Sequence, residues 1–138
     1  MSLFRIFTAA AFCLLLASGT PQAGRADDKD KEKDDLIKKD MTAIAAKKNV
    51  VGKVSGFVAT APERGKAKIE DLAPIINHTM DAFGPDRVMF GGDWPVCLLG
   101  VAKYADWATA LMTLVKDRPE EQQKKLFHDN AVKFYGLA

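Results

Sequence analysis

The chain has 138 residues, which gives room for one modest domain. Its apolar content of 48% and charged content of 28% are ordinary for a globular protein, so neither a collagen-like nor a low-complexity chain is expected. The formal net charge is only +2, and the basic residues are dispersed among acidic ones, which excludes a nucleic-acid-binding surface.

Residues 1–26 have the pattern of a secretory signal peptide and are expected to lie outside the folded domain. Arg5 gives a short positive region, and Ile6 to Ala17 form an apolar stretch of twelve residues. As a helix this stretch would span about 18 Å, too short for a hydrocarbon core of about 30 Å, although a retained anchor is the alternative interpretation. Small residues follow, so we expect cleavage after Ala23 or Ala26. The product would be secreted or periplasmic, with no membrane contact after cleavage.

The segment from Asp27 to Asp35 mixes both charges and has almost no apolar residues. Such a segment cannot bury enough surface to offset the cost of ordering, which predicts a disordered leader over residues 27–35. Apolar residues recur at steps of three and four from Leu36 onward, which predicts a helix that ends at Lys47–Asn49. We therefore expect the folded part of the chain to be residues 36–138.

Val50 to Ser55 is rich in β-branched residues and is predicted to be a strand. Ser55 stands at its exit, the end at which barrel enzymes collect polar groups. Lys53 lies within this strand, and the pattern leaves open whether its side chain points toward such a site or toward solvent. A loop with Pro62 and Gly65 follows, and then a predicted helix from Ile69 to Phe83 with acidic residues in its first turn.

The most informative stretch of the sequence runs from Arg87 to Cys97. Val88 to Phe90 is a short apolar run bounded by Pro85 and by a pair of glycines, which predicts a buried strand. The first side chain after the glycines is the carboxylate of Asp93. Parallel α/β folds present catalytic or metal-binding acids in this way, although an Asp after a strand is also a common turn former.

Two helical segments close the chain. The first is predicted at Lys103–Lys116, and its expected buried stripe consists of Tyr104, Trp107, Ala108, Leu111, Met112 and Val115. The second begins at Arg118–Glu121, with Pro in the first turn, and ends at Gly136. His78 has no second histidine at i+4 with which to share a metal, so it is expected to be a surface or packing residue. His128 is remote in sequence from Asp93 and is not expected to have a catalytic role. Cys97 has no base beside it in sequence and is interpreted as a small buried hydrophobic residue.

Three stretches together resemble one family. Arg87–Cys97 is similar to the signature near the end of the amidohydrolase-related superfamily, of the amidohydrolase 2 type, in the branch that includes sugar-lactone and dicarboxylate lactonases. Asn49–Gly56 resembles the preceding strand of that family, and Asn130–Leu137 resembles its closing helix. The likeness runs in order from about Asp40 to Leu137. The fold class expected is therefore α/β: a partial (β/α)8 TIM barrel, with its last two parallel strands and flanking helices, preceded by a signal-peptide helix.

The resemblance also implies a chemistry. In complete enzymes of the family, the residue matching Asp93 lies beside the attacking water, as a metal ligand or as a general base, and the water attacks a lactone or amide carbonyl. Trp94 and Ser55 are the candidate neighbours of Asp93 in the substrate pocket. The family implies a divalent metal, zinc or manganese, whose early His-x-His ligands lie upstream of the matching region. No His-x-His occurs in this sequence, so we expect no stable metal binding by this chain alone.

Two functions of different classes remain open. The first is an amidohydrolase-type hydrolase acting on a small lactone or amide, present here as a C-terminal part of a barrel that needs about 200 residues or more. The second is a non-catalytic remnant or a secreted interaction module. In either case two strands without barrel neighbours would leave open edges, with Val51, Val88 and Phe90 as candidates for exposed side chains, which predicts self-association through those edges.

Overall fold

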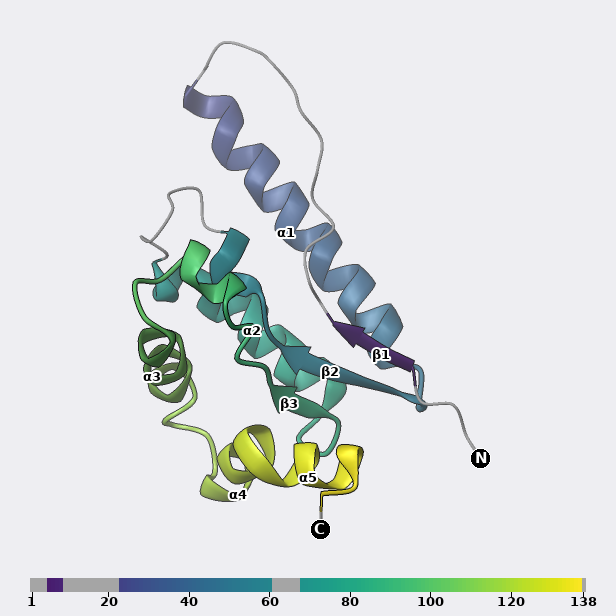
Figure 1. The fold of residues 1–138 in the computed structure, drawn as a ribbon. Coiled ribbons are helices and arrows are strands. Elements are labelled where there is room, and N and C mark those ends of the chain that lie inside the picture. Colours follow the sequence, from purple (N-terminus) through teal and green to yellow (C-terminus); the bar gives the residue numbers. More distant parts are fainter. Residues whose placement is uncertain (1–4, 9–22, 61–67, 138) are drawn as a thin grey trace.

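The computed structural model describes residues 5–8, 23–60 and 68–137 of the chain. Strands and helices alternate along most of it, and the strands form one sheet (Figure 1). In chain order the elements are β1 (Arg5–Thr8), α1 (Ala23–Ala45), β2 (Val50–Val54), the 3-10 turn η1 (Phe57–Thr60), α2 (Ile69–Phe83), β3 (Val88–Phe90), the 3-10 turn η2 (Val96–Leu99), α3 (Tyr104–Leu114), α4 (Glu120–Lys124), the π-helical turn η3 (Lys125–Asp129) and α5 (Asn130–Tyr135).

The sheet confirms the two predicted strands. β2 and β3 are parallel neighbours, with Gly52 opposite Val88 and Val54 opposite Phe90. Together with their helices they form the expected α/β arrangement. A third strand was not predicted: β1 pairs in parallel with the other edge of β2, so the strand order is β1-β2-β3. An unpaired strand edge is a template for any segment of β-forming residues, and β1 occupies that position.

The signal-peptide helix is not seen in the part of residues 1–26 that the structure describes. Arg5–Thr8, which include the start of the predicted apolar stretch, form a strand, and residues 9–22 lie outside the described part of the chain. Cleavage and export therefore stay predictions. Among the helices that the structure describes, none is long and apolar enough to cross a membrane.

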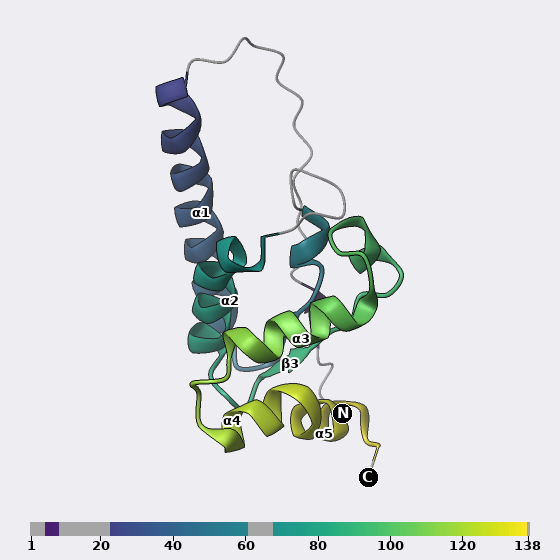
Figure 2. The same ribbon diagram turned by 90° about the vertical axis from the view of Figure 1, so that its left-hand side faces the viewer.

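The expectation of a disordered leader is corrected. Residues 27–35 lie inside α1, a helix of 23 residues that begins well before the predicted start at Leu36. The charges that argued for disorder also have helical spacing, since Asp34 and Asp35 each stand four residues before a lysine. Such pairs support an isolated helix by about 0.2–0.5 kcal/mol each. α1 then packs beside α2, which anchors its C-terminal half (Figure 2).

The two faces of the sheet differ in what they contact. Gly52 faces α2, because a β-carbon built on it would lie 2.9 Å from the ring of Phe83. Side chains alternate along a strand, so the residues that share the α2 face are Val50, Val54, Val88 and Phe90. The opposite face, here called the inner face, carries Val51, Lys53, Ser55, Met89 and Gly91.

This alternation overturns the expected set of exposed strand residues. Val88 is 1% exposed and Phe90 is half-buried, since both point toward the helices rather than toward a barrel interior. The ring of Phe90 lies 6.1 Å from that of Trp107 and 5.4 Å from that of Phe127. Val51 does lie on the inner face, yet it is also buried in a strand that has β1 at its side.

The helices build the core over the α2 face. α2 has the predicted bounds, and its residues Ile76, Thr79, Met80 and Phe83 are buried in this core. In α3 the stripe is only partly right: Trp107, Leu111 and Val115 are buried, whereas Tyr104 and Met112 are 42% and 52% exposed. Tyr104 is the first residue of the helix, and Met112 lies at the edge of the stripe, so both side chains reach solvent.

Two polar side chains fasten β3 to its surroundings. The Arg87 guanidinium donates to the carbonyl oxygens of Ala45 at 2.9 Å, Lys47 at 3.1 Å and Val50 at 3.2 Å, which ties the start of β3 to the end of α1 and the start of β2. From the C-terminal helical segment, the Asn130 amide donates to the carbonyl oxygens of Pro85 and Val88, both at 2.7 Å. These bonds satisfy buried backbone acceptors and fix the level at which β3 ends.

Candidate active site

The candidate site lies where β2 and β3 end. Parallel neighbours present their carboxyl ends at the same edge of a sheet, so Ser55, just after β2, and Asp93, just after β3, share one edge. The pairing continues past β3, because the Gly91 N–H donates to the carbonyl oxygen of Val54 at 2.9 Å. Asp93 is thus two residues beyond the last bond that holds the strands together.

Gly91 lets the inner face pack tightly below this edge. A β-carbon at Gly91 would lie 2.7 Å from the hydroxyl oxygen of Ser55 and 3.2 Å from Cε of Lys53. No ordinary side chain fits at such separations, so glycine leaves room for the serine hydroxyl and the lysine stem. Ser55 is buried and Lys53 is half-buried. The sequence pattern left the direction of Lys53 open, and the structure places it on the same face as Ser55.

Asp93 has an unusual backbone conformation. Its φ of 51° lies in the left-handed region, and among the described residues other than glycine it is the only one with positive φ. Its carbonyl oxygen accepts a hydrogen bond of 2.8 Å from the Cys97 N–H, which starts the turn that leads into η2. The carboxylate side chain is half-buried. Trp94 follows, joined to Pro95 by a cis peptide bond, and is 69% exposed.

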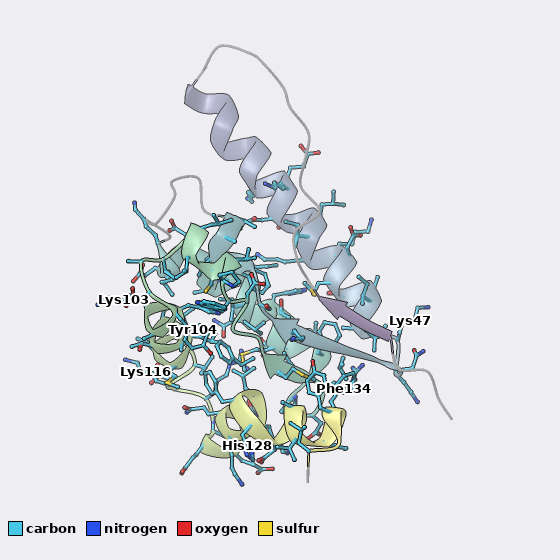
Figure 3. The ribbon with its side chains drawn as sticks, in the orientation of Figure 1. Lys47, Lys103, Tyr104, Lys116, His128 and Phe134 are labelled. Atoms are coloured by element: carbon cyan, nitrogen blue, oxygen red, sulfur yellow. The ribbon has the colours of Figure 1, made fainter. Side chains whose placement is uncertain are left out.

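The start of α3 supports the two glycines before Asp93. The indole N–H of Trp107 donates to the carbonyl oxygen of Gly91 at 3.2 Å inside the core. Tyr104 lies against the next residue, since a β-carbon on Gly92 would lie 2.9 Å from its hydroxyl oxygen. Figure 3 shows Tyr104 and Lys103 together at the start of α3. Tyr104 was predicted as core and is instead an aromatic residue at the rim of the site.

The charge of Asp93 affects the pKa of the nearby Cys97 thiol. Burial raises the pKa of the Cys97 thiol above its ordinary value, and the negative charge of Asp93 raises this pKa further. A thiol held neutral is a poor nucleophile. Cys97 is fully buried, which confirms its interpretation as a small hydrophobic residue.

The structure places both histidines away from this edge. His78 Nε2 lies 2.9 Å from the carbonyl oxygen of Lys38 and 2.9 Å from the hydroxyl oxygen of Thr42, so this side chain joins α2 to α1. His128 Nδ1 is 2.8 Å from the carboxylate of Asp129 on the C-terminal helical segment, apart from Tyr104 (Figure 3). These are the surface and packing roles that the sequence predicts.

The donor set at this edge does not by itself suit a metal ion. Among the described residues, no group of three or more His, Cys, Asp or Glu side chains could hold one. Among the described residues directly after β2 and β3, Asp93 is the single carboxylate, and catalytic metal sites use about three protein ligands. No catalytic step is therefore assigned to a metal on the residues of this chain.

Comparison with known proteins places the fold in a family. The sequence profile of the Amidohydrolase family matches residues 22–137, which is most of the chain. The chain belongs to the amidohydrolase family. This amidohydrolase chain is 38% identical over 98 residues to the L-fucono-1,5-lactonase of Burkholderia multivorans, and 32% identical over 98 residues to the uncharacterized protein y4mH of Sinorhizobium fredii. These matches cover 68% and 71% of this chain. The match to the L-fucono-1,5-lactonase supports the lactonase-like branch of the family.

Solved structures agree. The chain superposes on a crystal structure of an amidohydrolase from Burkholderia multivorans with bound HEPES, with a TM-score of 0.73 and 31% identity over 80% of this chain and 39% of that one. A second crystal structure of an amidohydrolase from that organism contains bound zinc, and gives a TM-score of 0.71 and 30% identity over 77% of this chain and 38% of that one. The chain spans about a third of the length of the curated relatives it matches, 33% and 32%.

Proposed function

We propose that this amidohydrolase chain supplies part of a lactone-hydrolysing site, in which the Asp93 carboxylate takes the proton of the attacking water. The observation that carries the proposal is the position of Asp93. It is the first side chain beyond β3 at the carboxyl edge of the sheet, beside the end of β2, and the chain around it is similar to a lactonase. Amide hydrolysis by the same group is the other reaction open to this site.

The proposed reaction is the hydrolysis of the ester bond in a sugar lactone. A water proton moves to the Asp93 carboxylate while the water oxygen bonds to the carbonyl carbon, giving a tetrahedral intermediate with a negatively charged oxygen. Collapse of this intermediate breaks the bond between the carbonyl carbon and the ring oxygen. The ring oxygen takes the proton back from Asp93, which restores the Asp93 carboxylate, and the product is an open-chain hydroxy acid. The new carboxylic acid group releases its own proton to solvent and is ionised at neutral pH.

Ser55 and Trp94 are assigned to the substrate. The Ser55 hydroxyl, buried beside Gly91, can donate a hydrogen bond to a substrate oxygen at the edge. The indole of Trp94 is largely exposed next to Asp93, and it can cover the apolar face of a sugar ring. The zinc-bound relative supports a divalent metal in the complete family site, and zinc or manganese is the metal that we propose there. In this chain Asp93 is the residue that could contribute to one.

An alternative is a non-catalytic module. It is favoured by the lack, among the described residues, of a cluster able to hold a metal, together with the absence of His-x-His from the sequence. The two functions differ in what Asp93 does. In the module Asp93 would only form the turn before η2, through its backbone carbonyl oxygen.

The test is an assay of lactone opening by the purified full chain, with L-fucono-1,5-lactone and with zinc or manganese added in separate arms. We expect little turnover above buffer, because a single carboxylate lacks the ligands of a complete site. Whatever turnover exceeds buffer should be lost in Asp93→Asn, whose amide cannot take the proton. Robust turnover that survives this substitution would contradict the assignment.

We also propose that the protein is exported, with removal of residues up to Ala23 or Ala26. The apolar stretch from Ile6 to Ala17 and the small residues after it support this proposal. N-terminal sequencing of the product from an exporting bacterial host should read from Gly24 or Asp27. An intact Met1 on soluble cytoplasmic protein would refute the proposal.

A further inference from the structure

Lys53 is a charged residue placed in the middle of a largely buried strand, which calls for an explanation. Lys53 has apolar Val51 two residues before it and buried Ser55 two residues after it on the inner face. Lysine is among the residues least often buried in proteins unless its charge is paired. Among the residues that the structure describes, Lys53 makes no ion pair, and neither does Asp93.

The stem of Lys53 leans toward the carboxyl edge of the sheet. Its partner in register on β3 is Met89, yet its Cε lies 3.2 Å from a β-carbon built on Gly91, two residues further along. Two residues of strand correspond to roughly 6.6 Å. The stem therefore rises along the inner face to the level of Gly91, and the ammonium stands one bond beyond Cε. The same glycine makes room for the Ser55 hydroxyl, so both donors converge beside Gly91.

We propose that Lys53 and Ser55 form a binding site for anionic oxygen at this edge, and that its ligand is the carboxylate of an aldonic acid, the product of sugar-lactone opening. A lysine ammonium and a hydroxyl are both hydrogen-bond donors to such oxygens, and a charged donor makes the stronger bond. The inference rests on the proposed function for the choice of ligand. The lactone carbonyl oxygen, which gains negative charge during water attack, would occupy the same place.

Asp93 and Lys53 have different roles at this edge of the sheet. Asp93 repels an anionic oxygen and attracts the proton of water, whereas Lys53 attracts the oxygen on the carbonyl carbon. Without a positive group, the Asp93 charge would disfavour any acidic ligand nearby. This division explains why a glycine, a serine and a lysine occur together on the inner face directly before the carboxylate.

The test is a titration of the isotope-labelled full chain with sodium L-fuconate at constant ionic strength, followed by amide chemical shifts. We expect saturable shifts at Ser55 and Gly91. Lys53→Met keeps the stem beside Gly91 but removes the charge, and should weaken binding by about tenfold or more, while Lys53→Arg should keep most of it. The matched control is Lys47→Met, which removes an exposed charge before the opposite end of β2 (Figure 3).

The outcomes separate this inference from the proposed function. Lack of saturable shifts in the wild-type chain, equal affinity in Lys53→Met, or equal weakening in Lys47→Met would each overturn the Lys53 site. Unchanged dispersion of the remaining amide signals shows that a variant is folded. Asp93→Asn should bind L-fuconate at least as tightly as wild type, because it removes a repelling charge. Loss of hydrolysis without loss of this binding would therefore support the roles assigned to Asp93 and Lys53 together.

Discussion

At the scale of single residues, the backbone conformation of Asp93 bears directly on the proposed chemistry. A left-handed conformation costs most residues with a β-carbon roughly 1–2 kcal/mol, and Asp is one of the few that tolerate it. The conformation turns the chain sharply after Gly92 and leaves the carboxylate half-buried at the edge of the sheet. An energetically costly backbone at the predicted catalytic residue agrees with a functional role for that residue.

This conformation predicts an ordered series of stabilities. Asp93→Gly should be more stable than Asp93→Ala by about 1 kcal/mol, because glycine adopts positive φ without a steric penalty. Asp93→Asn should resemble wild type, which makes it the proper variant for activity measurements. Urea unfolding of the three variants measures the differences. Equal stability of the glycine and alanine variants would show that position 93 is not held at positive φ.

Cys97 predicts a dependence of stability on pH. Its pKa is raised in the folded protein above the ordinary 9.0, first by burial and then by Asp93. The folded state therefore keeps the thiol proton at pH values where the unfolded chain loses it. The stabilising contribution is complete below pH 9.0 and falls as pH rises above it. Urea unfolding at a series of pH values should show this loss in wild type and a smaller loss in Cys97→Ser. Parallel curves would contradict the assignment.

The candidate residues were predicted to different degrees, for physical reasons. Asp93 and Ser55 stand at strand ends, and the end of a strand can be read from the residues around it. The direction of Lys53 depends on which face of the sheet meets α2, a tertiary property that one strand does not carry. The spacing of Lys53 and Ser55 could have indicated the direction of Lys53, because residues two apart in a strand lie on the same face of the sheet. Tyr104 was assigned to the core because helical periodicity alone cannot show where a helix begins to face solvent.

At the scale of elements, the short turns η1 and η2 hold the site edge together. Gly100, at the end of η2, lies directly on η1: a β-carbon there would come within 1.7 Å of the carbonyl oxygen of Val58. The tip of a flexible side chain could move away from such a clash, but the backbone of Val58 cannot do so without displacing η1. Val58 is fully buried, so η1 has no room to withdraw. This contact therefore fixes the position of η1, which follows β2, relative to η2, which follows β3.

Gly100→Ala should accordingly be strongly destabilising. We expect a loss at least about 2 kcal/mol larger than that of Gly136→Ala, since overpacking inside a closed contact costs about 1–3 kcal/mol or more. Gly136 is the matched control: it caps α5 with a φ of 64° and has no neighbour within 4 Å of a built β-carbon, so alanine meets only backbone strain. Thermal and urea unfolding compare the two variants. Similar losses would show that η1 and η2 are not in contact.

The elements themselves followed the sequence closely where periodicity was strong. α2 has the predicted bounds because apolar spacing, a first turn with two acids and a glycine after Phe83 all agree. The start of α1 was misplaced because composition argued for disorder and charge spacing argued for helix. β1 was missed because its four residues form a strand only through pairing with β2, a contact between segments far apart in the sequence.

At the scale of the whole molecule, the edges of the β2–β3 pair are covered, whereas two predicted strands alone would have left both edges open. β1 covers one edge of β2, and the Asn130 amide takes up the Val88 carbonyl oxygen on β3. Covering an edge with another element is a common protection against pairing between molecules. Export would change this, because cleavage after Ala23 or Ala26 removes β1 with the segment that contains it.

The chain beginning at Asp27 should therefore associate more than the full chain. The Gly52 N–H donates to the carbonyl oxygen of Arg87, directly before β3, so the Val51 N–H points to the opposite edge, which β1 would leave. Val51→Pro in the shorter chain removes that donor and should reduce association. Size-exclusion chromatography with light scattering measures the masses. A monomeric shorter chain with a cooperative melt would contradict the predicted role of β1.

The central claim is that the edge around Asp93 is the water-activating part of a lactone-hydrolysing site. The most direct test replaces the matching 98-residue segment of the L-fucono-1,5-lactonase from Burkholderia multivorans with that of this chain, and measures lactone opening. A folded chimera should hydrolyse L-fucono-1,5-lactone, and Asp93→Asn in it should lower kcat by about a hundredfold or more, the loss expected for a general base. A folded chimera that hydrolyses the lactone equally well with and without the Asp93 carboxylate would contradict the claim.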